Sequence, residues 1–185
     1  MSKITKIAMA QALKKLLIVK DLDKITINDI SNECGINRQT FYYHFRDIYD
    51  LLEWIFANEV VEKIEKETTI DNWQEQFMYV LNYMLENKFF IMKVYNSLSR
   101  KFLLDFLFKQ YNTIFIEIVD DLSKEYNITQ ENKKFIADFY KYALVNVVLE
   151  WIKNDMKDDY KIIVEKVSVL LKGTIDQALI NLKRN

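Results

Sequence analysis

Residues 26–45 read TINDISNECGINRQTFYYHF, and this stretch decides the fold of the amino-terminal part of the chain. Thr26, followed three residues later by Asp29, is a start signal for a helix over about 27–34. Gly35 is typical of the end of such a helix, and Asn37 can cap a second, short helix over about 38–45. Two helices joined by a tight, glycine-containing turn form a helix-turn-helix. The sequence therefore predicts this motif at residues 26–45.

The second helix of the motif carries polar side chains on the face that we expect to point outward. The expected outward residues are Arg38, Gln39, Tyr42 and Tyr43, with Asn37 at the tip. Arginine pairs bidentately with guanine and glutamine with adenine, whereas Asn, Thr and Tyr side chains donate to phosphates. The alternative is an ordinary helical corner whose polar side chains are only solvated. Residues 37–40 contain no acid, which favours contact with DNA.

Charge is distributed unevenly along the chain. The 185 residues have a formal net charge of -1. Residues 1–46 hold eight Lys or Arg and four acids, and the remainder holds 18 bases and 23 acids. A basic head on an acidic body indicates that the head meets a polyanion.

The rest of the chain is predicted to be helical throughout. Proline is absent and there are two glycines, which favours long helices and argues against a glycine-rich phosphate loop. Helical periodicity predicts nine helices, at about 3–20, 27–34, 38–45, 48–66, 71–86, 88–97, 100–125, 129–154 and 159–182. The first should stop near Asp21, because Asp tolerates a left-handed turn. The expected fold class is all-α, with three amino-terminal helices and six carboxyl-terminal ones.

The last two predicted helices are apolar over much of their circumference. Residues 142–149 read YALVNVVL, and residues 162–171 carry apolar side chains on more than one side. A helix that is apolar all round must be buried all round. In a body this small, we expect the second buried face to pack on another subunit, which predicts a homodimer formed by these two helices.

Several short stretches together resemble the DNA-binding domain of the tetracycline-repressor (TetR) family over about residues 4–60. They are TINDIS at 26–31, CGI at 34–36, TFYYHF at 40–45 and LL at 51–52. The resemblance implies an all-helical homodimer that binds a palindromic operator under the control of an effector. It also implies a DNA-binding domain at 1–47 and a dimerisation and signal-sensing domain at 48–185.

Residue roles follow from the resemblance by position. Thr26, Tyr42 and His44 match phosphate contacts, and Thr40 matches a contact at the start of the recognition helix. Asn37, Arg38 and Gln39 match positions that face bases. The expected DNA-binding set is completed by Asn28, Tyr43 and Arg46.

Four residues depart from the family pattern. Asp21 replaces a usual Gly, Cys34 a small Ala, Gln39 a common Gly and Ile48 a usual Lys. The replaced Lys makes a phosphate contact in the family. Here Arg46 or the amides at the start of the following helix must substitute, or the affinity for DNA is lower.

A finer resemblance concerns the source of the signal. RQTFY at 38–42, followed by LLEWIFAN at 51–58, resembles the subgroup that contains activators of dihydroxyacetone-kinase operons. In that subgroup the signal can arrive through a partner protein. The aromatic side chains of the body form either its core or a pocket for a small apolar effector. The candidates for a pocket are Trp54, Phe77, Tyr83, Phe106, Tyr111 and Tyr140.

Other functional classes fit the sequence poorly. His44 and Cys34 are the only residues of their kinds, so a zinc site would need carboxylates to complete it, and there is no Glu-x-x-His motif for a di-iron bundle. We therefore expect no enzyme, no metal and no cofactor. The longest uncharged run, ten residues at 76–85, is short of the roughly 20 that a membrane span needs. With a single cysteine, a cytoplasmic protein without membrane contact is expected. A helical adaptor that binds protein through the same corner is the alternative to a DNA-binding regulator.

Overall fold

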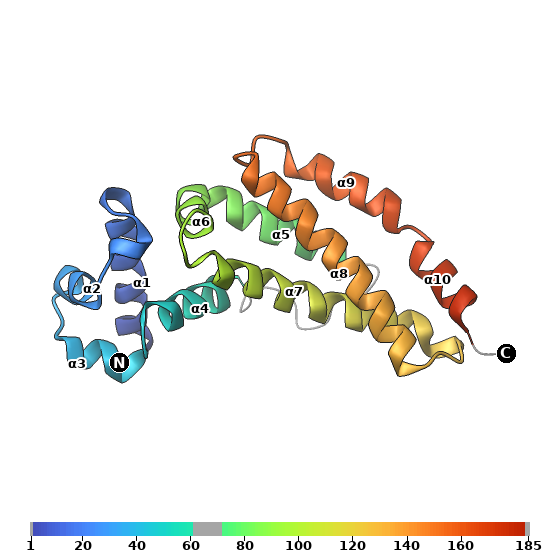
Figure 1. Ribbon diagram of the computed structural model, residues 1–185, viewed down its shortest axis with the longest axis horizontal. Coiled ribbons are helices and arrows are strands. Elements are labelled where there is room, and N and C mark those ends of the chain that lie inside the picture. The colour runs from blue at the N-terminus through green and yellow to red at the C-terminus, as the bar shows by residue number, and fades with distance from the viewer. Residues whose placement is uncertain (1, 61–71, 184–185) are drawn as a thin grey trace. The chain divides into compact units, whose positions relative to one another are not determined.

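The computed structural model describes residues 2–60 and 72–183, where the regular structure is helical, so the predicted all-α fold class is confirmed (Figure 1). The helices are α1 (Ser2–Val19), α2 (Ile27–Cys34), α3 (Arg38–His44), α4 (Ile48–Glu59), α5 (Trp73–Glu86), α6 (Lys88–Tyr95), α7 (Arg100–Leu122), α8 (Gln130–Lys153), α9 (Tyr160–Leu171) and α10 (Thr174–Leu182). Two 3₁₀ turns accompany them, η1 (Leu22–Lys24) and η3 (Ser123–Glu125). No helix in the described residues is both long and apolar enough to cross a membrane.

The helices group into two compact units. Within the described residues, the first unit contains 2–60 and 87–106, and the second contains 72–86 and 107–183. The helix α6 and the first residues of α7 therefore belong with the amino-terminal helices. The functional division predicted at residue 47 is a different matter and stays a prediction.

The first unit has α1 at its centre. This helix packs against α2, α3, α4 and α6. Leu13 and Leu17 of α1, Ile30 of α2 and Phe41 of α3 have no exposed surface. Burying an aliphatic or aromatic side chain of this size stabilises a fold by roughly 1.5–3 kcal/mol. These side chains fix α2 and α3 against α1.

Polar contacts join the turn after α1 to α6 and the segment that follows it. The Lys93 Nζ lies 2.9 Å from Asp21 Oδ1, and this contact lowers the pKa of Asp21 below its usual range. The Asp23 Oδ2 accepts a hydrogen bond of 3.1 Å from the backbone N–H of Leu98. From α1 itself, Lys14 reaches Asn87 Oδ1 at 3.2 Å. These bonds connect two parts of the first unit that are far apart in sequence.

The second unit is held by long helices with aromatic side chains between them. Helix α5 packs on α9, and α10 packs on both α8 and α9. The ring of Phe77 meets that of Tyr111 edge to face at 5.7 Å, which joins α5 to α7. The ring of Phe115 stacks on that of Tyr140 at 5.8 Å, which joins α7 to α8.

Two predicted details differ from the structure, and a third concerns residues that the structure does not describe. The helix expected over 159–182 is divided into α9 and α10, because Gly173 has a φ of 73°, a left-handed conformation that interrupts a helix and suits glycine. Asp21 was expected to be left-handed, which is wrong: its φ is −76°, and its carbonyl accepts a bond from Lys24 N–H that closes η1. Helix α4 ends at Glu59, and both residues 61–66 of the helix expected over 48–66 and residue 71, the expected start of the next helix, lie outside the described residues.

Candidate nucleic-acid interface

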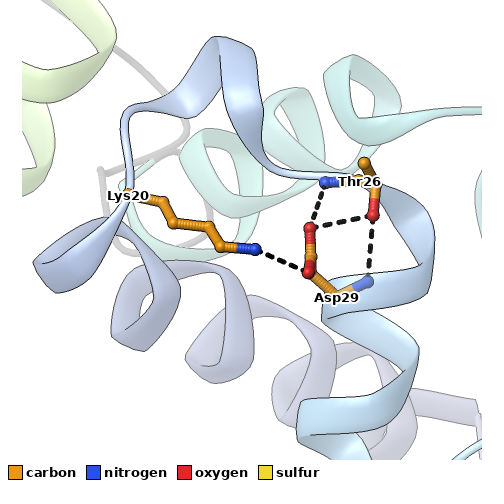
Figure 2. A network of polar contacts seen from close by, with 3 residues as sticks. All are labelled: Lys20, Thr26 and Asp29. Atoms are coloured by element: carbon orange, nitrogen blue, oxygen red, sulfur yellow. Dashed lines mark hydrogen bonds and ion pairs between the residues drawn. The ribbon is translucent and has the colours of Figure 1, made fainter.

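The first helix of the predicted motif begins with a complete capping box (Figure 2). Thr26 Oγ1 accepts a hydrogen bond of 3.1 Å from Asp29 N–H. In return, Asp29 Oδ2 accepts bonds from the Thr26 backbone N–H at 2.9 Å and from the Thr26 hydroxyl at 2.8 Å. The start of α2 is thereby fixed by two residues that the sequence identified.

A third residue joins this box from the end of α1. Lys20 Nζ lies 2.7 Å from Asp29 Oδ1, the carboxylate oxygen that the capping box leaves unused (Figure 2). The contact with Lys20, followed by the two hydrogen bonds from Thr26, lowers the pKa of Asp29 to about 2. Asp29 is therefore ionised at any physiological pH.

The turn between the two helices is a glycine C-cap. Gly35 has a φ of 67°. Its N–H bonds to Asn32 O at 3.1 Å, and the Ile36 N–H bonds to Ser31 O at 2.9 Å. A residue with a side chain is strained in this left-handed conformation, so glycine at this position sets the sharpness of the turn.

The second helix, α3, buries one side and exposes the other. Phe41 is fully buried beneath it, and Asn37 caps it by accepting bonds from Thr40 N–H at 2.7 Å and Thr40 Oγ1 at 2.9 Å. The predicted DNA contacts that are exposed in residues 26–45 are Thr26, Asn28, Asn37, Arg38, Gln39, Tyr42 and Tyr43. The structure therefore brings the predicted base-facing residues together on one accessible surface.

The remaining predicted contacts border that surface. Arg38 Nη2 lies 3.5 Å from the Tyr42 hydroxyl, one helical turn along α3. Thr40 and His44 are half-buried, and the ring of His44 meets that of Tyr43 edge to face at 5.0 Å. Arg46 has 85% of its side chain exposed, with its Nε 3.5 Å from Asp50 Oδ2. Its guanidinium is thus accessible to a phosphate.

The six predicted pocket residues do not share one site. Trp54 packs edge to face on Phe45 in the first unit, and there Phe106 stacks on Phe56. The other four, Phe77, Tyr83, Tyr111 and Tyr140, belong to the second unit. Tyr140 lines an apolar cavity of about 290 Å³, and its hydroxyl donates to Thr174 Oγ1 at 3.0 Å. No group of three or more potential metal ligands occurs in the described part of the chain.

Comparison with known proteins identifies the family. The family model described as "Bacterial regulatory proteins, tetR family" matches residues 11–55, which contain the helix-turn-helix. A second model, "Transcriptional regulator C-terminal region", matches residues 71–173. The chain belongs to the TetR family. It is a DNA-binding transcriptional regulator, and members of this family bind operator DNA and are typically homodimers.

This TetR-family regulator is similar in sequence to an activator and in fold to a second solved structure. The HTH-type dhaKLM operon transcriptional activator DhaS of Lactococcus lactis subsp. lactis (strain IL1403) is 31% identical over 150 residues, 80% of each chain. A solved structure of a dihydroxyacetone kinase operon activator DhaS has a TM-score of 0.71 and 25% identity, covering 99% of this chain and all of the other. NalD, a repressor of a multidrug efflux pump in Pseudomonas aeruginosa, is 12% identical over both full chains with a TM-score of 0.56, and shares the fold. The DhaS sequence and the DhaS structure confirm the predicted family and the DhaS-like subgroup.

The contact of Lys20 with Asp29 was not predicted from the sequence of this regulator. Lys20 lies nine residues before Asp29, directly after the end of α1, and no local pattern connects the two. A basic residue at the end of one helix could be paired with the first-turn acid of the next only after the packing of α1 on α2 was known.

Proposed function

We propose that this regulator binds a palindromic operator as a homodimer, with α3 of each subunit in a major groove. The observation that carries the proposal is the exposed polar surface of α3, on which Arg38 and Gln39 stand free of acidic neighbours in their own helix. In a helix-turn-helix, the amino-terminal residues of the second helix reach base edges. Arg38 reads a guanine and Gln39 an adenine, while Tyr42, Tyr43 and Arg46 contact phosphates.

The dimer would form through α8 and α9. On α8, Phe135, Phe139 and Tyr142 are 68%, 61% and 52% exposed at spacings of four and three residues, which places them on one helix face. On α9, Val169 and Leu170 are about 70% exposed. A monomer rarely presents so much aromatic and aliphatic surface to water. The apolar cavity beside Tyr140 opens on the same helices, where a second copy would cover it.

Selection of bound sequences from random DNA tests the operator proposal. We expect a palindrome whose half-site centres lie about one helical turn, ~34–36 Å, apart or slightly more. The affinity for this site should fall steeply with salt, because counterions are released from the phosphates. Recovery of asymmetric sites bound by one subunit would contradict it, as would sedimentation of 22.3 kDa monomers alone at micromolar concentration.

A finer function is favoured by the relative named as a dhaKLM operon activator. We infer that this regulator activates an operon for dihydroxyacetone kinase in the cytoplasm. A reporter placed behind the natural promoter next to the selected operator tests this. Expression should rise when the regulator is present; a fall would make it a repressor instead.

The effector would be a small apolar molecule or a partner protein. Among the candidate residues, Tyr111 is favoured for a small molecule, because its buried hydroxyl has no hydrogen-bond partner in the described structure. Burial also raises the pKa of Tyr111 above its usual range, so the hydroxyl stays a donor. Leaving such a group unsatisfied costs about 1–3 kcal/mol. Y111F should therefore unfold at the same or a higher temperature; a clearly lower temperature would show that the hydroxyl is already bonded.

A further inference from the structure

A carboxylate stands at the end of the helix-turn-helix that approaches the DNA backbone. In this motif the first helix crosses the sugar-phosphate backbone, and helix amino termini commonly contact phosphates. The first turn of α2 carries Asp29, which is ionised and half-buried. An ionised carboxylate at that end repels the phosphate that the helix must approach.

The capping box engages the side chain of Thr26, which limits the phosphate contact that the family resemblance assigns to it. Its hydroxyl has one proton, which it donates to Asp29 Oδ2 at 2.8 Å, while its oxygen accepts from Asp29 N–H. A bond from this hydroxyl to phosphate would require the capping box to open. A donor at this end of the motif must therefore come from the backbone amides that the capping box leaves unused or from another side chain.

Lys20 has both the charge and the spare donors. Its ammonium group lies 2.7 Å from Asp29 Oδ1, and a lysine ammonium carries three N–H donors (Figure 2). The side chain is 41% exposed, so it remains accessible to solvent while it holds Asp29. The long, flexible stem lets the ammonium contact a phosphate without leaving the carboxylate.

We propose that Lys20 is a positioning residue for operator binding: it cancels the charge of Asp29 at the start of α2 and offers its remaining donors to the phosphate that approaches there. This proposal rests on the proposed mode of DNA binding. Its distinctive consequence is energetic coupling, because the value of Lys20 to DNA binding depends on the carboxylate that it neutralises.

The same pair of helices supplies a matched control. Lys15 of α1 forms an ion pair with Glu33, which lies near the opposite end of α2. K15Q removes one positive charge from α1 and K20Q removes one from the residue directly after it, and each breaks one ion pair with α2. A general effect of net charge or of helix packing would therefore appear in both variants.

The test measures binding of the full chain to its selected operator by fluorescence anisotropy, between about 50 and 200 mM salt. K20Q should bind about tenfold more weakly at the lower salt and lose about one unit of salt slope for each subunit on DNA. K20R should bind like the unmodified protein, and K15Q should stay within about twofold of it. D29N should bind as well or better, and K20Q should cost clearly less in the D29N background.

Three results would overturn the proposal. Equal losses in K20Q and K15Q would make Lys20 one charge among many. An equal loss from K20Q with and without D29N would remove the coupling between the two residues. A lower unfolding temperature for K20Q with unchanged salt slope would make its role structural. Failure of the unmodified protein to bind any selected DNA would instead refute the proposed function itself.

Discussion

The helix-turn-helix at residues 26–45 and the long helices α8 and α9 treat apolar side chains in opposite ways. In the first region, Ile30 and Phe41 are fully buried and the accessible side chains are polar or tyrosine. In the second, Phe135, Phe139 and Leu170 remain accessible. The surface of the helix-turn-helix is polar and suits a charged, hydrated partner. The surface of α8 and α9 exposes apolar side chains and suits another protein surface.

The largest effect is expected from removing the side chain that fixes α3. F41A should lower the free energy of unfolding by about 3–5 kcal/mol, because Phe41 is fully buried and leaves a cavity. Chemical denaturation followed by circular dichroism measures this loss. Operator binding should disappear while dimerisation persists. A dimer lost together with DNA binding would show that the two surfaces are not independent.

The next largest effect is expected at the apolar surface of α8 and α9. F139D should weaken the dimer by about 2 kcal/mol or more, roughly 30-fold in its dissociation constant, because it would place a charge in the proposed α8–α9 interface. Analytical ultracentrifugation over a dilution series provides the measurement. I4D is the matched control, since Ile4 of α1 is 76% exposed and lies outside α8 and α9. Equal weakening in both would argue against the α8–α9 interface.

Substitution of two arginines tests whether base reading and phosphate contact are made by different residues of the polar surface. R38A should cost about 1–3 kcal/mol and relax the preference at one base pair. R46A should weaken binding to all sequences alike and reduce the salt slope by about one. Competition between the operator and its single-base variants distinguishes them. A uniform loss in R38A would make Arg38 a phosphate contact.

The smallest effect concerns acid stability. The pKa of Asp29 is about 2 in the folded protein, below the ordinary 3.8, so this residue stabilises the fold above pH 3.8 and the contribution is lost as pH falls towards 2. D29N lacks this titration. Its stability should therefore vary less than that of the unmodified protein between about pH 4 and 2, as followed by circular dichroism during acid titration. Parallel pH profiles would show that Asp29 is not held as described.

Local signals explain why the helix-turn-helix was predicted closely. Thr26, Asp29, Gly35 and Asn37 act within three or four residues of themselves, so their pattern is visible in the sequence and the structure places each at its expected cap or turn. Gly173 gave the same kind of signal. The helical prediction passed over it because apolar residues continue on both sides at helical spacing.

Contacts between segments that are distant in the chain could not be predicted from the sequence. Asp29 pairs with Lys20, and Asp21 pairs with Lys93 besides the nearby Lys24. The pairings with Lys20 and Lys93 depend on how whole helices pack. Aromatic residues gave a similar ambiguity. Phe77 and Tyr111 have the same helical spacing whether they fill a core or line a pocket. Only their burial and the unpaired Tyr111 hydroxyl, which the structure supplies, bear on the choice between these two roles.

The bonds from Asp21 to Lys93 and from Asp23 to the backbone of Leu98 have a practical meaning for engineering. Because residues 87–106 complete the amino-terminal unit, this unit is built from two segments that are separate in the sequence. A hybrid regulator made by a single crossover after α4 would pair the turn at η1 with a foreign α6. To transfer the whole amino-terminal unit to another regulator, both of its segments must be exchanged, so that Asp21 and Lys93 come from the same protein.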